Sequence, residues 1–111
     1  MRHLSRQIHE QFIRATRMVL VVHQNPDGDA LGSATALQEY LLSQDKNVCI
    51  WSSTAISPKY AFLPHIHSIT SDPEIFTADN IDLIIVLDSG DLSYAGINKL
   101  VAGLEHKIIN I

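Results

Sequence analysis

Apolar runs alternate with amphipathic segments along the 111 residues, which predicts strands alternating with helices. Buried strands are expected at residues 18–23, 48–51, 81–87 and 107–111. Apolar residues at helical spacing predict helices over 4–16, 30–43 and 92–104. The segment 52–80 is less regular, with short helical turns expected after Ser57 and at 71–76. This alternation is typical of an α/β fold with a doubly wound parallel sheet and helices on both faces.

Acidic and histidine side chains occur where two of these strands end. The segment 23–33, HQNPDGDALGS, follows the first strand and leads into the second helix, and Asp88 directly follows the run 81–87. Neighbouring strands of a parallel sheet end at one edge, and ligands bind there. We therefore expect Asp88 to lie near Asp27 and Asp29.

Three carboxylates and one imidazole at one edge predict a metal site. Like charges in a cleft repel one another, and a divalent cation removes that repulsion. Oxygen ligands suit Mg²⁺ and Mn²⁺, and Mn²⁺ also accepts imidazole. Two such ions would polarise a phosphate and lower the pKa of a bridging water, so metal-assisted phosphoester hydrolysis is the predicted reaction class. The candidate ligands are His23, Asp27, Asp29 and Asp88, and the three aspartates are the candidate catalytic residues.

Each of these residues also has an ordinary structural interpretation. Asp29 suits the N-cap of the following helix, Asp27 suits a turn, and Asp88 suits the cap of the next helix. His23 suits a hydrogen-bonded histidine at a strand end. The conjunction of His-x-x-x-Asp-x-Asp at one strand end with Asp at another favours the metal site.

The composition of the chain limits the kinds of partner that it is expected to bind. Eight Lys and Arg against twelve Asp and Glu give a net charge of −4, which argues against gripping long nucleic acid by charge alone. A single cysteine gives no disulfide framework, so a cytoplasmic setting is expected. No apolar run approaches the ~20 residues of a membrane span, so no membrane partner is expected. Trp51, Tyr60 and Phe62 are expected in the core, and His65 and His67 on the surface or in loops.

The segment 23–33 resembles the first motif of the DHH phosphoesterase family, and Asp88-Ser89-Gly90-Asp91 is similar to its second. Phe62-Leu63-Pro64 is similar to the nanoRNase and pAp-phosphatase branch. The resemblance implies hydrolysis of short oligoribonucleotides or pAp-like nucleotides at a two-Mn²⁺ site. It implies that His23 and Asp27 bind the first ion, Asp29 the second, and Asp88 both.

The resemblance also implies that residues 1–111 are only the amino-terminal part of a DHH domain. The family's Asp-His-His motif follows a strand that here begins near Lys107, and the sequence stops at Ile111. The third and fourth motifs and the carboxyl-terminal substrate domain are absent, so we expect this chain alone to be inactive. One alternative is a fragment of a RecJ-like single-stranded DNA exonuclease or a cyclic-dinucleotide phosphodiesterase. Another is a non-catalytic metal- or nucleotide-binding module that associates through an edge strand or as a homodimer.

Overall fold

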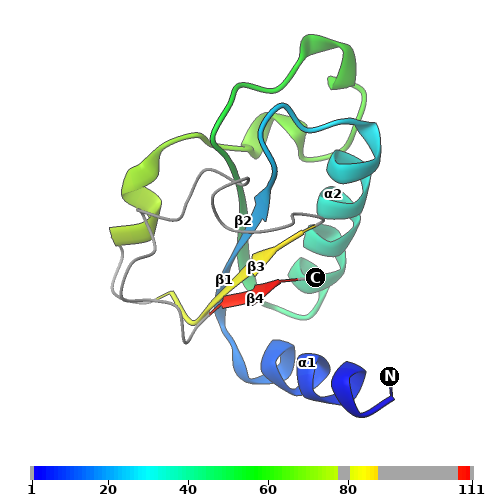
Figure 1. The fold of residues 1–111 in the computed structure, drawn as a ribbon, viewed down its shortest axis with the longest axis vertical. Helices are drawn as coiled ribbons and strands as arrows, with labels where there is room; N and C mark the ends of the chain where they lie inside the picture. The colour runs from blue at the N-terminus through cyan, green and yellow to red at the C-terminus, as the bar shows by residue number, and fades with distance from the viewer. Residues whose placement is uncertain (1, 78–80, 88–107, 111) are drawn as a thin grey trace.

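A computed structural model describes residues 2–77, 81–87 and 108–110 and shows an α/β fold built on a parallel sheet (Figure 1). The sheet has four strands in the order β2-β1-β3-β4, and every neighbouring pair is parallel. The strands are β1 (Arg17–Val22), β2 (Asn47–Ser52), β3 (Leu83–Val86) and β4 (Ile108–Asn110). The helices are α1 (Arg2–Arg14) and α2 (Gly28–Ser43), with short 3-10 turns η1 (Pro58–Tyr60), η2 (Ile66–Ser68) and η3 (Pro73–Thr77). The predicted fold class is confirmed.

The central strand β1 is buried on both faces, which explains its continuous apolar sequence. Residues 18–22 have no exposed surface. Alternate side chains point to opposite faces of a strand, so the core divides into two clusters. Met18, Leu20 and Val22 pack in the cluster that contains residues of α2, with Phe12 of α1 against it. Val19 and Val21 pack on the other face, in the cluster that contains Phe76 of η3.

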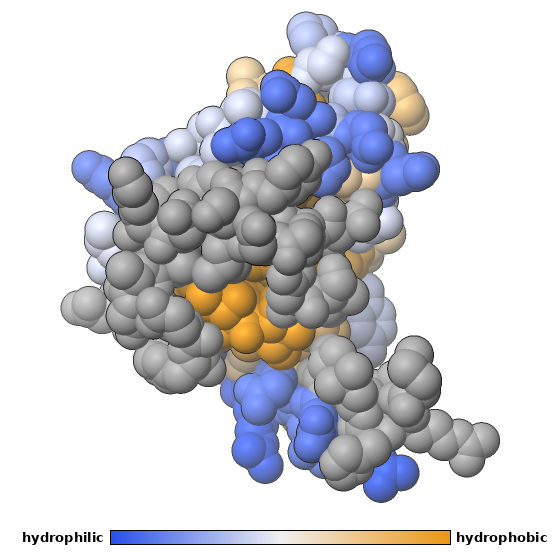
Figure 2. Space-filling model, viewed as in Figure 1, coloured by the Kyte–Doolittle hydropathy of each residue, from blue (hydrophilic) through white to orange (hydrophobic). Residues whose placement is uncertain are grey.

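Helical segments pack on both faces of the sheet. In the part of the chain that the structure describes, α2 covers one face of the sheet, and the short turn η3 packs on the other. The predicted helix 92–104 lies outside the described residues. In Figure 2 the surface is polar at the two ends of the long axis, and an apolar region lies between them, over the sheet.

Element boundaries are shifted by one or two residues from their predicted places, as is usual for helix and strand ends. The first strand ends at Val22, so His23 lies just outside it. The helix α2 begins at Gly28, two residues before the predicted start. The turn predicted at 71–76 is the 3-10 helix η3.

Backbone and carboxylate hydrogen bonds fix β3 against β1 at both ends. Oδ2 of Asp82 accepts from the N–H groups of Thr16 and Arg17 at 2.8 and 2.9 Å. The Asp82 N–H donates to the Arg17 carbonyl at 2.9 Å. At the opposite end, the Leu87 N–H donates to the carbonyl of Val21 at 2.9 Å. The chain therefore leaves both strands at the same edge of the sheet.

Candidate functional site

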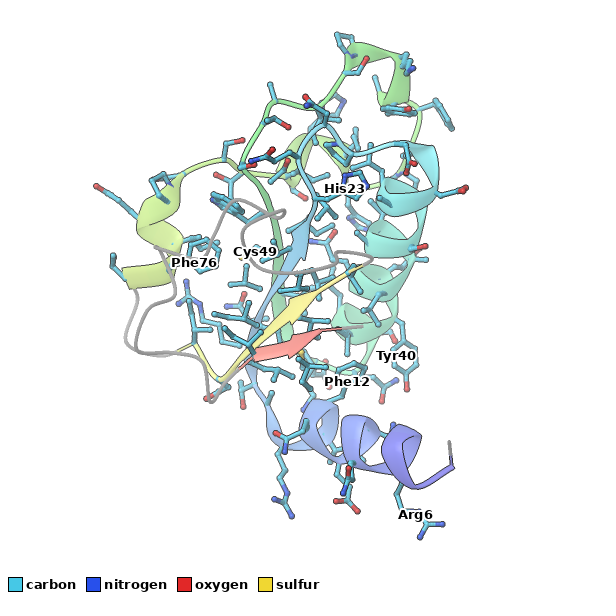
Figure 3. All side chains as sticks on the ribbon, viewed as in Figure 1. Arg6, Phe12, His23, Tyr40, Cys49 and Phe76 are labelled. Atoms are coloured by element: carbon cyan, nitrogen blue, oxygen red, sulfur yellow. The ribbon has the colours of Figure 1, made fainter. Side chains whose placement is uncertain are left out.

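The loop from β1 to α2 carries three of the four predicted metal ligands. His23 follows the last residue of β1 and is partly buried, with its side chain at the carboxyl edge of the sheet (Figure 3). Asp27 and Asp29 are both exposed where α2 begins. The loop therefore lies, as predicted, at the carboxyl edge of the parallel sheet.

Asp27, and not Asp29, is the N-cap of α2. Its backbone is extended, with φ −89° and ψ −178°, and its Oδ1 accepts a hydrogen bond of 2.9 Å from the Ala30 N–H. Its carbonyl also accepts from the Leu31 N–H at 3.0 Å. The interpretation of Asp29 as the cap is therefore wrong, because Asp29 lies in the first turn of the helix. A carboxylate has a second oxygen, so capping through Oδ1 leaves Oδ2 of Asp27 as an acceptor for a cation.

A backbone contact sets the tautomer of His23. Its Nδ1 lies 2.8 Å from the Gln24 carbonyl oxygen. A carbonyl only accepts, so Nδ1 is the donor, and in the neutral imidazole the lone pair is on Nε2. A backbone hydrogen bond on one ring nitrogen is the usual way in which a protein orients a histidine that binds a metal through the other.

The same loop is held from its other side by the segment that follows β2. Asn25 adopts a left-handed conformation with φ 50°, which Asn tolerates better than most residues. Its N–H donates to Oγ1 of Thr54 at 2.8 Å. A Cβ added at Gly28 would lie 3.4 Å from Cε1 of Tyr60, so the ring packs closely over this glycine. These two contacts fix the position of the residues around Asp27.

A cleft of about 530 Å³ opens beside Asp27, between residues 25–27 and residues 55–60. Tyr60 is partly buried in its wall, and Nζ of Lys59 lies 5.1 Å from the centroid of the Tyr60 ring. Sequence reasoning missed this cleft. Trp51 is buried as expected, but Tyr60 lines the cleft, and the prediction of a core position is wrong for Phe62, which is 78% exposed.

The donor types at this edge suit Mn²⁺ or Mg²⁺, since they are carboxylate oxygens and an imidazole nitrogen. Within residues 2–77, 81–87 and 108–110, however, no three His, Cys, Asp or Glu side chains are grouped closely enough to hold a metal ion. Asp88 lies outside the described residues. The ligand set His23, Asp27, Asp29 and Asp88 therefore stays a prediction.

The two histidines of the segment 52–80 make no described contact with the loop from β1 to α2. His65 and His67 are both exposed around η2, in agreement with the expected surface position. Among the residues that the structure describes, no helix is both long enough and apolar enough to cross a membrane.

A parallel sheet with a polar strand-to-helix loop at its carboxyl edge defines an α/β domain of the class that binds ligands at that edge. Residues 17–111 match the N-terminal domain of the DHH family. The chain belongs to the DHH family, a family of the phosphoesterase type. The comparison with curated proteins found no match.

Among solved structures, the chain is similar to an exopolyphosphatase-related protein from Bacteroides fragilis. The TM-score is 0.89, the sequence identity is 27%, and the similarity covers 100% of this chain and 34% of the Bacteroides chain. This chain thus spans about a third of the length of that protein. The specific resemblance to the nanoRNase and pAp-phosphatase branch is not tested by either similarity.

Proposed function

We propose that this chain is the amino-terminal part of a phosphoesterase that uses two Mn²⁺ ions to hydrolyse short oligoribonucleotides or pAp-like nucleotides. The observation that carries the proposal is the common edge of β1 and β3. The Leu87 N–H is bonded to the Val21 carbonyl, two residues before His23. Asp88 follows Leu87 directly in the sequence, so the two segments that carry the proposed ligands follow strands that end at the same edge of the sheet.

In this proposal His23 and Asp27 bind the first ion, Asp29 binds the second, and Asp88 binds both. When bound, the ions supply charge that polarises the phosphate and lowers the pKa of a water. The start of α2 attracts anions through its dipole and N–H groups, whereas the exposed carboxylates of Asp27 and Asp29 repel them. The cations therefore decide whether a phosphate can approach this edge.

The charge of the chain supports a small substrate. The net charge of −4 disfavours long nucleic acid, including the substrate of a RecJ-like exonuclease. The Bacteroides neighbour is named for polyphosphate, whose hydrolysis also transfers a phosphoryl group to water, so inorganic polyphosphate is the second candidate substrate. A nucleotide substrate agrees with the cytoplasmic setting that we propose for this chain.

The metal claim is tested by thermal unfolding with and without Mn²⁺. A ligand of the folded state raises its stability by about 2.7 kcal/mol at 100 times its Kd. We expect Mn²⁺ to raise the Tm of the unaltered chain and to raise that of Asp29→Asn much less. Asp45→Asn is the matched control, because Asp45 is an exposed carboxylate beyond the far end of α2 and Asn tolerates its φ of 62°. A full Mn²⁺ response in Asp29→Asn would contradict the proposed ligand set.

The expected inactivity of the chain alone has its own assay. We expect no hydrolysis when the purified 111-residue chain is incubated with Mn²⁺ and a ribodinucleotide. Turnover that rises in proportion to the concentration of the chain would refute this expectation.

A further inference from the structure

We propose that the cleft beside Asp27 binds the nucleoside part of a phosphate ester, with Tyr60 as the specificity-determining residue and Lys59 as a cation that attracts the phosphate. This inference rests on the proposed function, since it places the phosphate at the edge formed by the β1–α2 loop. It goes further by choosing an organic phosphate over inorganic polyphosphate. The choice follows from the size, the lining and the rigidity of the cleft.

The size and position of the cleft suit the organic half of a small ester. Its volume of about 530 Å³ lies within the range of roughly 300–1,000 Å³ that is typical of small-molecule sites. Asp27, a predicted metal ligand, is one of its lining residues. A phosphate bound at the metal site would therefore have its ester group at the mouth of this cleft.

The lining is chemically suited to a ring system. Pro26, Ile56, Pro58 and Tyr60 supply apolar or aromatic surface. Nucleobases bind to such surfaces by stacking, whereas a polyphosphate chain has no apolar part to bury. Among the described residues that line the cleft, Lys59 is the only cation. A polyanion that extended through the cleft would have most of its charges unpaired.

The walls are fixed before any ligand binds. The hydrogen bond from Asn25 to Thr54 joins the two segments that form the cleft. The Tyr60 ring is held against Gly28 at the first residue of α2. A preformed aromatic wall reduces the ordering cost of binding, which favours a rigid planar ligand. The ammonium of Lys59, 5.1 Å from the ring centroid, adds a positive charge at the same wall.

The test compares the binding of 5′-AMP and of inorganic tripolyphosphate by titration calorimetry in the presence of Mg²⁺. Replacing a stacking aromatic by Ala typically weakens nucleotide binding by about tenfold or more. We expect that loss for AMP in Tyr60→Ala, and affinity within about twofold of the unaltered chain in Tyr60→Phe, which keeps the ring. Tripolyphosphate binding should be unchanged in both variants. Lys59→Gln should weaken both ligands, because it removes a charge that either can use.

Two further variants keep the test decisive. Phe62→Ala is the matched aromatic control, because Phe62 is 78% exposed and does not line the cleft; it should bind AMP normally. Ser57→Leu places a larger side chain in the cleft and leaves the Tyr60 ring in place. The Ser57 side chain makes no capping bond to η1, so its replacement should not unfold this turn. It should weaken AMP binding even if Tyr60→Ala fails to fold.

The proposed subsite would be overturned if the unaltered chain did not bind AMP. It would also be overturned if Tyr60→Ala or Ser57→Leu bound AMP as tightly as the unaltered chain. An equal loss of tripolyphosphate binding in Tyr60→Ala would overturn the choice of an organic ligand. The Mn²⁺ thermal shift is measured separately and does not depend on Tyr60. A normal Mn²⁺ response without AMP binding would remove the subsite and keep the metal site. Tyr60-dependent AMP binding without a Mn²⁺ response would keep the subsite and remove the metal-dependent phosphoesterase.

Discussion

Substitutions at Asp27 can separate its structural role from its predicted metal-binding role. Its Oδ1 caps α2 through the Ala30 N–H at 2.9 Å. Asp27→Ala removes this bond and the negative charge beside the helix dipole. Loss of an N-cap costs about 1 kcal/mol, and the charge contributes roughly 0.3–1 kcal/mol more. We therefore expect Asp27→Ala to lower the free energy of unfolding by about 1.5 kcal/mol.

Asp27→Asn keeps a side-chain oxygen in the capping position and removes only the charge. Asn and Asp are about equally good N-caps, so the loss should be limited to about 0.3–1 kcal/mol. For a domain of this size 1 kcal/mol corresponds to roughly 4 °C, so Asp27→Ala should lower the Tm by about 6 °C and Asp27→Asn by about 1–4 °C. Both variants lose the carboxylate that we propose as a metal ligand, so both should lose most of the Mn²⁺-induced gain in stability.

The assay is urea unfolding followed by far-UV circular dichroism and by the fluorescence of the single tryptophan, with and without Mn²⁺. Asp45→Asn again serves as the control and should retain both stability and Mn²⁺ response. If Asp27→Asn were as unstable as Asp27→Ala, the capping argument would fail. If Asp27→Asn kept the full Mn²⁺ response, its carboxylate would not be a metal ligand.

Further predictions concern three residues in the sheet or packed against it. Phe76→Ala removes a buried ring whose centroid is 5.1 Å from that of Trp51, and it should cost about 3–5 kcal/mol, measured by urea unfolding. Burial raises the pKa of the Cys49 thiol above its ordinary value of 9.0, and the charge of Arg17 partly offsets this rise. Because the thiolate is the reactive form, Cys49 should react slowly with iodoacetamide at pH 8 in the folded chain and rapidly in urea. The folded state then holds this proton to a higher pH than the unfolded state, so the free energy of unfolding should fall as the pH rises through 9, and Cys49→Ala should abolish that part of the fall. Asp82→Ala removes the acceptor of two backbone N–H groups and should cost about 1–3 kcal/mol by the same unfolding assay; an unchanged stability would mean that water replaces the carboxylate without loss.

The sheet could be predicted from the sequence because burial on both faces leaves a plain signal. The strand β1 has five consecutive residues with no exposed surface, and such a run is hard to mistake for a loop. The start of α2 was less certain because Asp27 and Asp29 are both good caps, and only the backbone geometry distinguishes them. The position of the loop at the carboxyl edge followed from the parallel order of the strands.

The cleft could not be predicted, because its two walls are about thirty residues apart in the sequence. One wall is residues 25–27, and the other lies in a segment without hydrophobic periodicity. The exposure of Phe62 was missed for the same reason, since an aromatic residue in an irregular segment has no pattern that assigns it to the core or to the surface. The carboxylate contacts of Asp82 with Thr16 and Arg17 are also long-range and leave no local signal.

Asp82 and Leu87 are both hydrogen-bonded to residues at the two ends of β1, so the number of residues between them is fixed by the length of the sheet. That number sets where the chain leaves β3 toward the proposed site. One residue inserted into β3 would advance the following chain by about 3.3 Å and turn each later side chain to the opposite face. The spacing between β3 and Asp88 on which the proposed metal site depends would then be lost, even if the inserted residue were apolar and the sheet remained intact. Within β3, therefore, relatives of this chain should tolerate exchanges among Leu, Ile and Val far better than any change in the number of residues.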